Sequence, residues 1–146
     1  MRVLVLHNRY RSGDTSGENR VVHDESELLR TAGHDVTTWQ AEPQVDTLAG
    51  QVRAATDAVW SRRAAAKVRT LVAERSIDVV HAHNLFPSLS PAVLRAARDA
   101  GAAVVVTLHN YRYLCLPGSL IRDGSACDVC VGRVPWRGVV HRCYRG

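Results

Sequence analysis

The chain has 146 residues, and its 46% hydrophobic and 23% charged residues are typical of a globular protein rather than a disordered or collagen-like one. No apolar run approaches the about 20 residues of a membrane-spanning helix. The N-terminus also lacks the apolar core and cleavage site of a signal peptide, so we expect a cytoplasmic protein. The net charge is +5, and residues 102–146 contribute most of it with six Arg and two Asp. This basic tail favours a phosphate-bearing ligand, a membrane surface or nucleic acid, although a solvated basic surface also accounts for it.

Short apolar runs alternate with segments of helical spacing along the chain. Strands are expected at residues 2–7, 35–39, 78–83 and 102–108, the last of them apolar enough to be central. Helices are expected from Glu18 to a stop at Gly33, over residues 46–75 as two helices or one kinked helix, and from a Ser90–Pro91 start to Gly101. This alternation predicts an α/β fold with a doubly wound, Rossmann-like parallel sheet.

The last third of the chain has a different character. From Tyr111 onward no helical or alternating period is evident, and all four cysteines lie there. We therefore expect a Rossmann-like core over residues 1–110 and an irregular Cys/Arg-rich segment of the same, incomplete domain over residues 111–146.

Ligands of doubly wound sheets bind beyond the carboxyl ends of the strands. Three candidate segments follow: residues 7–18, 81–86 and 109–113, all expected at one edge of the sheet. In the first, Ser16, Gly17 and Glu18 stand just before a helix, after the earlier Gly13. Backbone N–H groups at a helix start attract phosphate, and glycine allows close approach. An ordinary strand-to-helix turn fits the same residues.

Histidine followed by asparagine occurs at the ends of the third and fourth expected strands, as His83–Asn84 and His109–Asn110. Residues 81 and 83 should share one face of a strand. Imidazole can hydrogen-bond sugar hydroxyls or phosphate, or transfer a proton. The alternative for each histidine is a structural role.

The four cysteines are the second group with chemical potential. Cys127 and Cys130 form a C-x-x-C pair, with Cys115 before it and Cys143 after it. Four thiolates on a loop-rich segment suit a tetrahedral structural zinc, with His141 as a substitute ligand. Metal binding would supply folding energy that the segment's few apolar residues do not. A redox pair, or free or disulfide-linked cysteines, are the alternatives.

Arginines interleave with aromatic residues in the same segment. This pattern raises a zinc-dependent nucleic-acid-binding protein as a rival hypothesis. Because a membrane surface or plain solvation explains the arginines as well, we expect no nucleic-acid partner.

Two longer motifs carry a resemblance. Residues 78–84 (DVVHAHN) and 106–112 (VTLHNYR), together with the opening strand and Ser16–Glu18, resemble the N-terminal domain of family 4 glycosyltransferases. Cys115, the RDG at 122–124, Cys127, Cys130 and residues 141–146 (HRCYRG) resemble a subgroup with a cysteine-bearing insertion. The resemblance covers essentially the whole chain.

The resemblance implies an acceptor-side domain of a retaining GT-B-fold transferase. It implies that Ser16 and Gly17 approach the diphosphate of a nucleotide-sugar donor, and that His109, with Asn110, contacts the donor sugar as the catalytic histidine. Glu18, His83 and Asn84 would face a glycan or lipid-linked acceptor. The transfer would need no catalytic metal, so any zinc would be structural. Peripheral contact with the inner membrane face would suit the basic tail.

The donor-binding C-terminal domain of the family does not occur within these 146 residues. A retaining transfer needs the leaving diphosphate to be held and its charge stabilised. We therefore expect the chain to be inactive alone and to need that domain in cis or in trans. The rival from another class is a non-catalytic sugar- or nucleotide-binding module.

Overall fold

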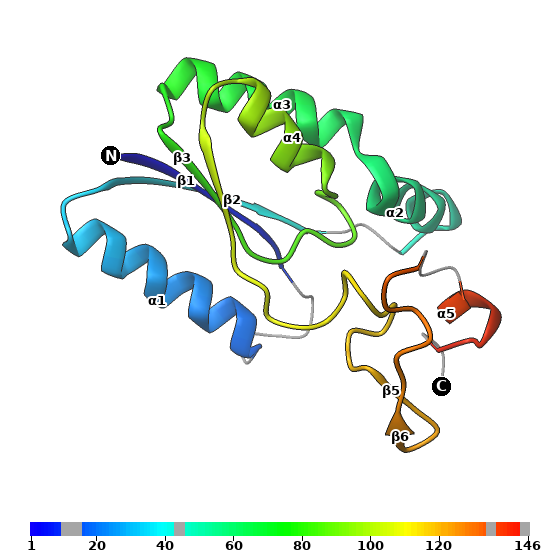
Figure 1. Ribbon diagram of the computed structural model, residues 1–146. Helices are drawn as coiled ribbons and strands as arrows, with labels where there is room; N and C mark the ends of the chain where they lie inside the picture. The colour runs from blue at the N-terminus through cyan, green and yellow to red at the C-terminus, as the bar shows by residue number, and fades with distance from the viewer. Residues whose placement is uncertain (10–15, 43–45, 134–136, 144–146) are drawn as a thin grey trace. The chain divides into compact units, whose positions relative to one another are not determined.

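The computed structural model describes residues 1–9, 16–42, 46–133 and 137–143. The chain divides into two compact units, Met1–Thr107 and Leu108–Gly146. The sequence analysis placed this boundary after residue 110. The first unit alternates strands and helices, whereas the second contains short elements (Figure 1).

A four-stranded parallel sheet is the centre of the first unit. Its strands are β1 (Arg2–Asn8), β2 (Asp35–Ala41), β3 (Val79–Ala82) and β4 (Ala103–Val106), in the order β2-β1-β3-β4. The central position predicted for the fourth strand is wrong, because β4 lies at the edge of this sheet. Its apolar content reflects one covered face: Val104 and Val106 pack against the core, while Val105 is 47% exposed.

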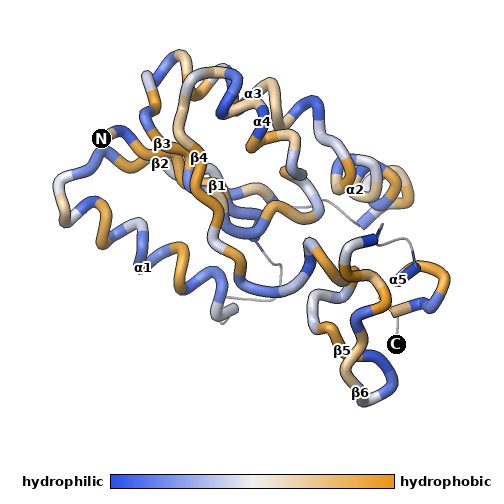
Figure 2. Tube along the Cα trace, viewed as in Figure 1, coloured by the Kyte–Doolittle hydropathy of each residue, from blue (hydrophilic) through white to orange (hydrophobic). Residues whose placement is uncertain are grey.

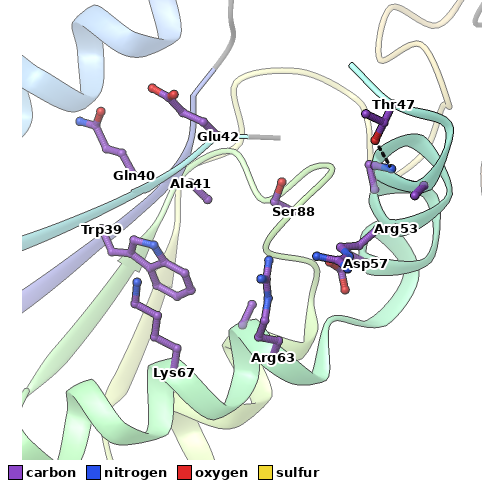
Figure 3. A pocket seen from close by; sticks show the side chains of 14 residues that line it. Trp39, Gln40, Ala41, Glu42, Thr47, Arg53, Asp57, Arg63, Lys67 and Ser88 are labelled. Carbon is purple, nitrogen blue, oxygen red and sulfur yellow. Dashed lines mark hydrogen bonds between the residues drawn. The ribbon is translucent and has the colours of Figure 1, made fainter. Parts of the chain in front are cut away.

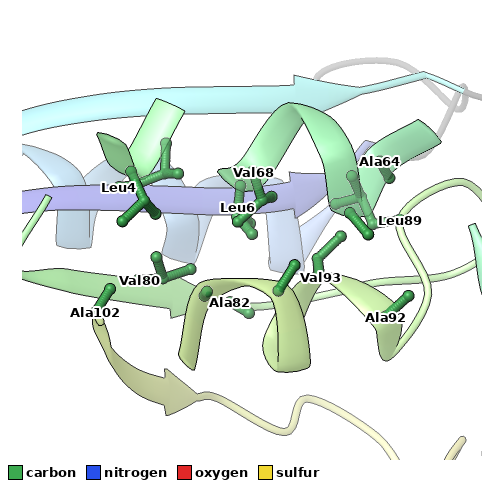
Figure 4. Close-up of a cluster of buried hydrophobic side chains, with 14 of the residues drawn as sticks. Leu4, Leu6, Ala64, Val68, Val80, Ala82, Leu89, Ala92, Val93 and Ala102 are labelled. Atoms are coloured by element: carbon green, nitrogen blue, oxygen red, sulfur yellow. The ribbon is translucent and has the colours of Figure 1, made fainter. Parts of the chain in front are cut away.

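Helices cover both faces of the sheet. Helix α1 (Gly17–Thr31) covers one face, and α3 (Arg62–Arg75) and α4 (Ala92–Asp99) cover the other, whereas α2 (Leu48–Trp60) buries no residue. On one face Leu6 packs with Val68 of α3 and Val93 of α4 (Figure 4). On the other face Val5 packs with Val22 of α1. Fully burying such a side chain contributes about 1.5–3 kcal/mol relative to exposing it. The predicted doubly wound, Rossmann-like α/β class is therefore confirmed.

Two buried serines determine how the helices of the α3–α4 layer begin. Ser61 separates α2 from α3, and its Oγ accepts a hydrogen bond from the Ala64 N–H at 3.3 Å. Ser90 Oγ accepts from the Ser61 N–H at 2.9 Å and from the Ala92 N–H at 3.3 Å. The segment 46–75 therefore forms two helices, and α4 begins at Ala92, with Pro91 just before its first residue.

The second unit is largely irregular, as predicted, and its regular elements are short. Strands β5 (Ile121–Arg122) and β6 (Ser125–Ala126) pair antiparallel, and α5 (Arg137–Val140) makes one turn. Gly138 is buried against Leu116, so close that a Cβ at Gly138 would lie 2.8 Å from the Leu116 Cβ. Elements of two and four residues are too short for a periodic pattern to indicate them.

Hydropathy follows the layers of the first unit. Figure 2 shows hydrophobic residues concentrated along the strands, whereas α1 alternates hydrophobic and hydrophilic residues. Of the helices within the described residues, none is long and apolar enough to span a membrane.

Candidate functional site

Three histidines lie on the α1 face of the sheet, toward the carboxyl ends of β1 and β3. His7 belongs to β1, His81 to β3, and His83 follows β3 directly; they are 1%, 8% and 2% exposed. The ring centroids of His81 and His83 are 4.4 Å apart, and His83 meets His7 edge-on at 6.4 Å. As strand alternation predicts, residues 81 and 83 share one face.

Polar groups of α1 and β4's end contact these rings. His7 Nε2 lies 2.7 Å from Asn19 Oδ1, and His81 Nε2 lies 2.8 Å from Thr107 Oγ1. The Glu25 carboxylate faces His81 and His83. Its Oε1 lies 3.4 Å from His81 Nδ1, and its Oε2 lies 3.7 Å from His83 Nε2. Glu25 was not among the residues predicted from the sequence. Its position three residues after buried Val22 marks the inward face of the helix.

Asn84 stabilises the loop after β3 through hydrogen bonds of its side-chain amide. Its Nδ2 donates to the Asn8 carbonyl at 3.2 Å, and its Oδ1 accepts from the Phe86 N–H at 3.2 Å. Asn8 in turn accepts from the Ser88 N–H through Oδ1 at 3.0 Å. Asn84 is only 7% exposed. Its amide therefore joins the end of β1 to the loop, and its predicted acceptor contact stays a prediction.

The start of α1 is the described part of the first candidate loop, since Gly13 lies outside the described residues. Ser16 is the N-cap residue without a side-chain cap bond, and its carbonyl accepts from the Arg20 N–H at 3.1 Å. Gly17 is exposed, with open space where a Cβ would stand. Glu18 lies in the first turn, where an acidic side chain suits the helix dipole.

A cavity of about 510 Å³ lies where β2 ends. Figure 3 shows Trp39 of β2 with Arg63 and Lys67 of α3 around it, and Arg53 and Asp57 of α2 on its far side. The volume is within the about 300–1,000 Å³ of small-molecule sites. No sequence pattern indicates this site, because residues 39, 53 and 63 become neighbours only through the order of the elements.

Cations and an aromatic ring dominate the chemistry of this cavity. The Lys67 Nζ stands 4.2 Å from the Trp39 ring centroid, which is a cation–π contact. With Arg53 and Arg63, three cationic side chains line the cavity, against the two carboxylates of Glu42 and Asp57. An anionic ligand with an apolar face would match this lining.

His109 and Asn110 belong to the second unit, and both are partly buried. Asn110 Oδ1 accepts from the Arg112 N–H at 3.0 Å. A Cβ on Gly118 would lie 3.2 Å from the same oxygen, and the Gly118 carbonyl accepts from the Tyr111 N–H at 3.0 Å. Asn110 is thus fixed by its own loop, and its donor-side role with His109 stays a prediction.

All four cysteines line one small cavity of the second unit. Cys115, Cys127, Cys130 and Cys143 are free thiols around a space of about 20 Å³, together with His141. Such a space accommodates about one water-sized particle. Among the residues that the structure describes, however, the group of possible metal ligands whose ligand atoms all lie within 4.8 Å of one another is Glu25, His81 and His83. No set of these cysteines meets that distance. The predicted zinc ligation stays a prediction.

Three side chains outside these clusters have clearly shifted pKa values, and one is Arg20, whose pKa is raised by its hydrogen bond to the Asp24 carboxylate. The backbone N–H of Arg2, at 2.6 Å, is the main cause that lowers the pKa of Asp78. Burial raises the pKa of Tyr113 above its ordinary value. Tyr113 lies in the candidate segment 109–113, whereas Arg20 and Asp78 lie outside the site candidates described above.

The parallel sheet with helices on both faces places the first unit in the Rossmann-like α/β class. The family model described as Glycosyltransferase Family 4 matches residues 15–125. Since the match covers most of the chain, this protein belongs to that family.

A solved structure entitled "Solution structure of a phosphate-loop protein" is 15% identical, covers 77% of this chain and 82% of its own, and superposes with a TM-score of 0.48. A search of curated protein sequences found no match.

Proposed function

We propose that this chain is the acceptor-side half of a retaining glycosyltransferase that moves a sugar from a nucleotide-sugar donor to a glycan or lipid-linked acceptor. The observation that carries the proposal is the family match over residues 15–125. That range includes α1, most of the sheet and His109, so it covers the candidate donor- and acceptor-side residues of this chain.

The reaction breaks the bond between the sugar's anomeric carbon and the donor diphosphate. A new glycosidic bond forms to an acceptor hydroxyl, which gives up its proton, and the diphosphate leaves with the negative charge. Such a transfer is accelerated by groups that hold the leaving diphosphate and stabilise its developing charge. Ser16 and Gly17 are our candidates on this chain, because open space adjoins Gly17 at a helix start.

His109 is the proposed catalytic residue, as a contact of the donor sugar. The hydrogen bond from the Arg112 N–H to Asn110 Oδ1 supports this role by fixing the loop that carries the histidine. A residue held by its own loop needs little reorganisation when the donor binds.

On the acceptor side we propose Glu18, His83 and Asn84, extended by the Trp39 cavity. His83 and Asn84 are 2% and 7% exposed, so they act by supporting the sheet edge around the acceptor. The residues of the cavity would contact the acceptor directly: Trp39 offers a flat face for a sugar ring, and Arg63 can bind a phosphate.

Three further parts belong to this proposal. A donor-binding domain, in cis or in trans, completes the enzyme, and the chain is inactive without it. The cysteines bind a structural zinc and mark the subgroup with the cysteine-bearing insertion. The arginine-rich second unit gives peripheral contact with the inner membrane face, where a lipid-linked acceptor would lie.

The test combines this chain with a family donor-binding half and follows release of the nucleoside diphosphate from a panel of nucleotide sugars with added acceptors. His109→Ala should lower kcat/KM by about 100-fold or more. His34→Ala, directly before the start of β2, is the matched control and should keep activity. If no combination turns over any nucleotide sugar, the enzyme assignment fails and a binding module remains.

The Trp39 cavity is tested in the same assay. Arg63→Glu should raise the KM for a phosphate-bearing acceptor by about tenfold while kcat stays close to that of the parent, because the arginine binds without reacting. Arg69→Glu changes the same charge on the same helix outside this cavity and should leave KM unchanged. Equal KM values for the two variants would place the acceptor elsewhere.

A further inference from the structure

We propose that Glu25, His81 and His83 bind one divalent transition-metal ion of the Zn²⁺ type. Their ligand atoms all lie within 4.8 Å of one another. The two imidazoles come from the end of β3 and the carboxylate from the facing side of α1, so the ion would join a helix to the sheet. This site is separate from the cysteines of the second unit and does not rest on the proposed function.

The distances fit a coordination sphere better than a direct ion pair. Glu25 Oε1 lies 3.4 Å from His81 Nδ1, and Oε2 lies 3.7 Å from His83 Nε2. A charge-assisted hydrogen bond would be about 2.7–2.9 Å. Two ligands of one tetrahedral zinc, each about 2.0–2.2 Å from the metal, stand about 3.3–3.6 Å apart. Each histidine nitrogen therefore lies about as far from a Glu25 oxygen as two ligands of a shared metal do.

The orientation of the histidines supports the same reading. His81 Nε2 is engaged by Thr107 Oγ1 at 2.8 Å, which leaves Nδ1 directed at Glu25. Metal-binding histidines commonly use their second nitrogen in such a hydrogen bond, which fixes the tautomer and the ring. The His83 ring is held between His81 and His7 by the ring contacts described above.

Burial and donor chemistry indicate the kind of ion. The side chains of His81 and His83 are 10% and 0% exposed, whereas Glu25 is 34% exposed and offers an entry path. Two imidazole nitrogens and one carboxylate suit Zn²⁺ or Co²⁺, while Mg²⁺ and Ca²⁺ prefer oxygen ligands. A water molecule would complete the tetrahedron.

The experiment uses the 146-residue chain carrying Cys127→Ser and Cys130→Ser, so that metal binding by the cysteine cavity is weakened. The metal-free protein is titrated with Co²⁺, followed by visible absorption, and the cobalt is then displaced with Zn²⁺. We expect about one equivalent of tetrahedral cobalt without the strong near-ultraviolet absorption of thiolate ligation. Binding with an affinity in the micromolar range or tighter is the expected result.

The matched pair is Glu25→Gln and Glu27→Gln. Both change the same residue type on α1, but Glu27 pairs with Arg30 on the exposed side. Glu25→Gln should weaken metal binding by at least about tenfold, and Glu27→Gln should not. A second readout needs no ligand substitution: added Co²⁺ should broaden the NMR signals of the His81 and His83 rings and leave those of His34 sharp.

Two results would overturn the proposal. One is a folded protein that binds neither cobalt nor zinc at tens of micromolar, with sharp signals from both rings. The other is equal affinity in the Glu25→Gln and Glu27→Gln variants, which would locate the metal elsewhere. Either result leaves the glycosyltransferase assignment untouched, because that is measured by turnover of nucleotide sugars.

Discussion

The exposed carboxylate of Asp78 links the starts of two strands. It accepts from the Arg2 N–H at 2.6 Å and contacts the Arg2 guanidinium at 3.4 Å, although both side chains are open to solvent. The backbone hydrogen bond is the main cause that lowers the pKa of Asp78 in the folded protein. The charged carboxylate is therefore favoured by folding, and protonation in acid removes that advantage.

We predict an acid-dependent loss of stability at this residue. Because the folded pKa lies below the ordinary value of about 3.9, the contribution is complete above that value and disappears as pH falls through the folded pKa. Asp78→Asn keeps an accepting oxygen but removes the charge, so its stability should change less between pH 6 and pH 3. Urea unfolding at several pH values measures this. Parallel pH profiles for parent and variant would refute it.

The sequence predicts individual site residues only as far as local geometry determines them. That His81 and His83 share a face follows from strand alternation, and the structure agrees. That Glu25 faces them depends on which strand α1 covers, and that Trp39 meets Lys67 depends on where α3 lies. Such pairs, more than 25 residues apart, are set by topology rather than by any local pattern.

At the scale of elements, buried serines link helix ends that lie far apart in sequence. Ser90 Oγ is the acceptor for both the Ser61 N–H and the Ala92 N–H, at the α2–α3 break and the start of α4. Both serines are fully buried, at 0% and 1% exposure, so water cannot replace these bonds. A buried donor left without its acceptor costs about 1–3 kcal/mol.

We therefore predict a graded series of stabilities. Ser90→Ala should lower the free energy of unfolding by about 1–3 kcal/mol, because two backbone donors lose one shared acceptor. Ser61→Ala removes the cap of α3 and should cost about 1 kcal/mol. Thr70→Ala, exposed in the middle of α3, should stay within about 0.5 kcal/mol. Denaturant unfolding gives the order, and equal losses in all three would contradict it.

Long periodic elements were predictable and short ones were not. The apolar spacing over residues 46–75 predicts helix, but whether Ser61 breaks or kinks it depends on Ser90. The edge position of β4 was not predicted. Val104 and Val106 cover the core from one face of β4, and they make this edge strand as apolar as a central strand. The short elements β5, β6 and α5 show no periodic pattern, because turns and the close packing at Gly138 determine their structure.

At the scale of the whole molecule, the two units differ in the interactions that can stabilise the fold of each. The first has a core of fully buried residues on both faces of its sheet. In the second unit, the described residues 108–133 and 137–143 form one turn of helix and two strands of two residues. Among their hydrophobic side chains Cys115 is buried, whereas Tyr113, Leu114, Ile121 and Val139 are exposed. So little apolar burial would leave folding of this unit to another source of free energy.

The proposed zinc at the cysteine cavity supplies that source, and it predicts independent loss of the second unit. Cys127→Ser with Cys130→Ser should remove about one zinc per chain and abolish amide protection over residues 115–133 and 137–143. Strands β1 to β4 should keep their protection, because their contacts lie within the first unit. Val131→Ala, exposed beside Cys130, is the control and should retain both metal and protection. Metal analysis and hydrogen exchange test this prediction. A metal-free second unit whose amides stay protected would contradict it, and would mean that the packing of Gly138 on Leu116, and contacts like it, are enough to keep this unit folded.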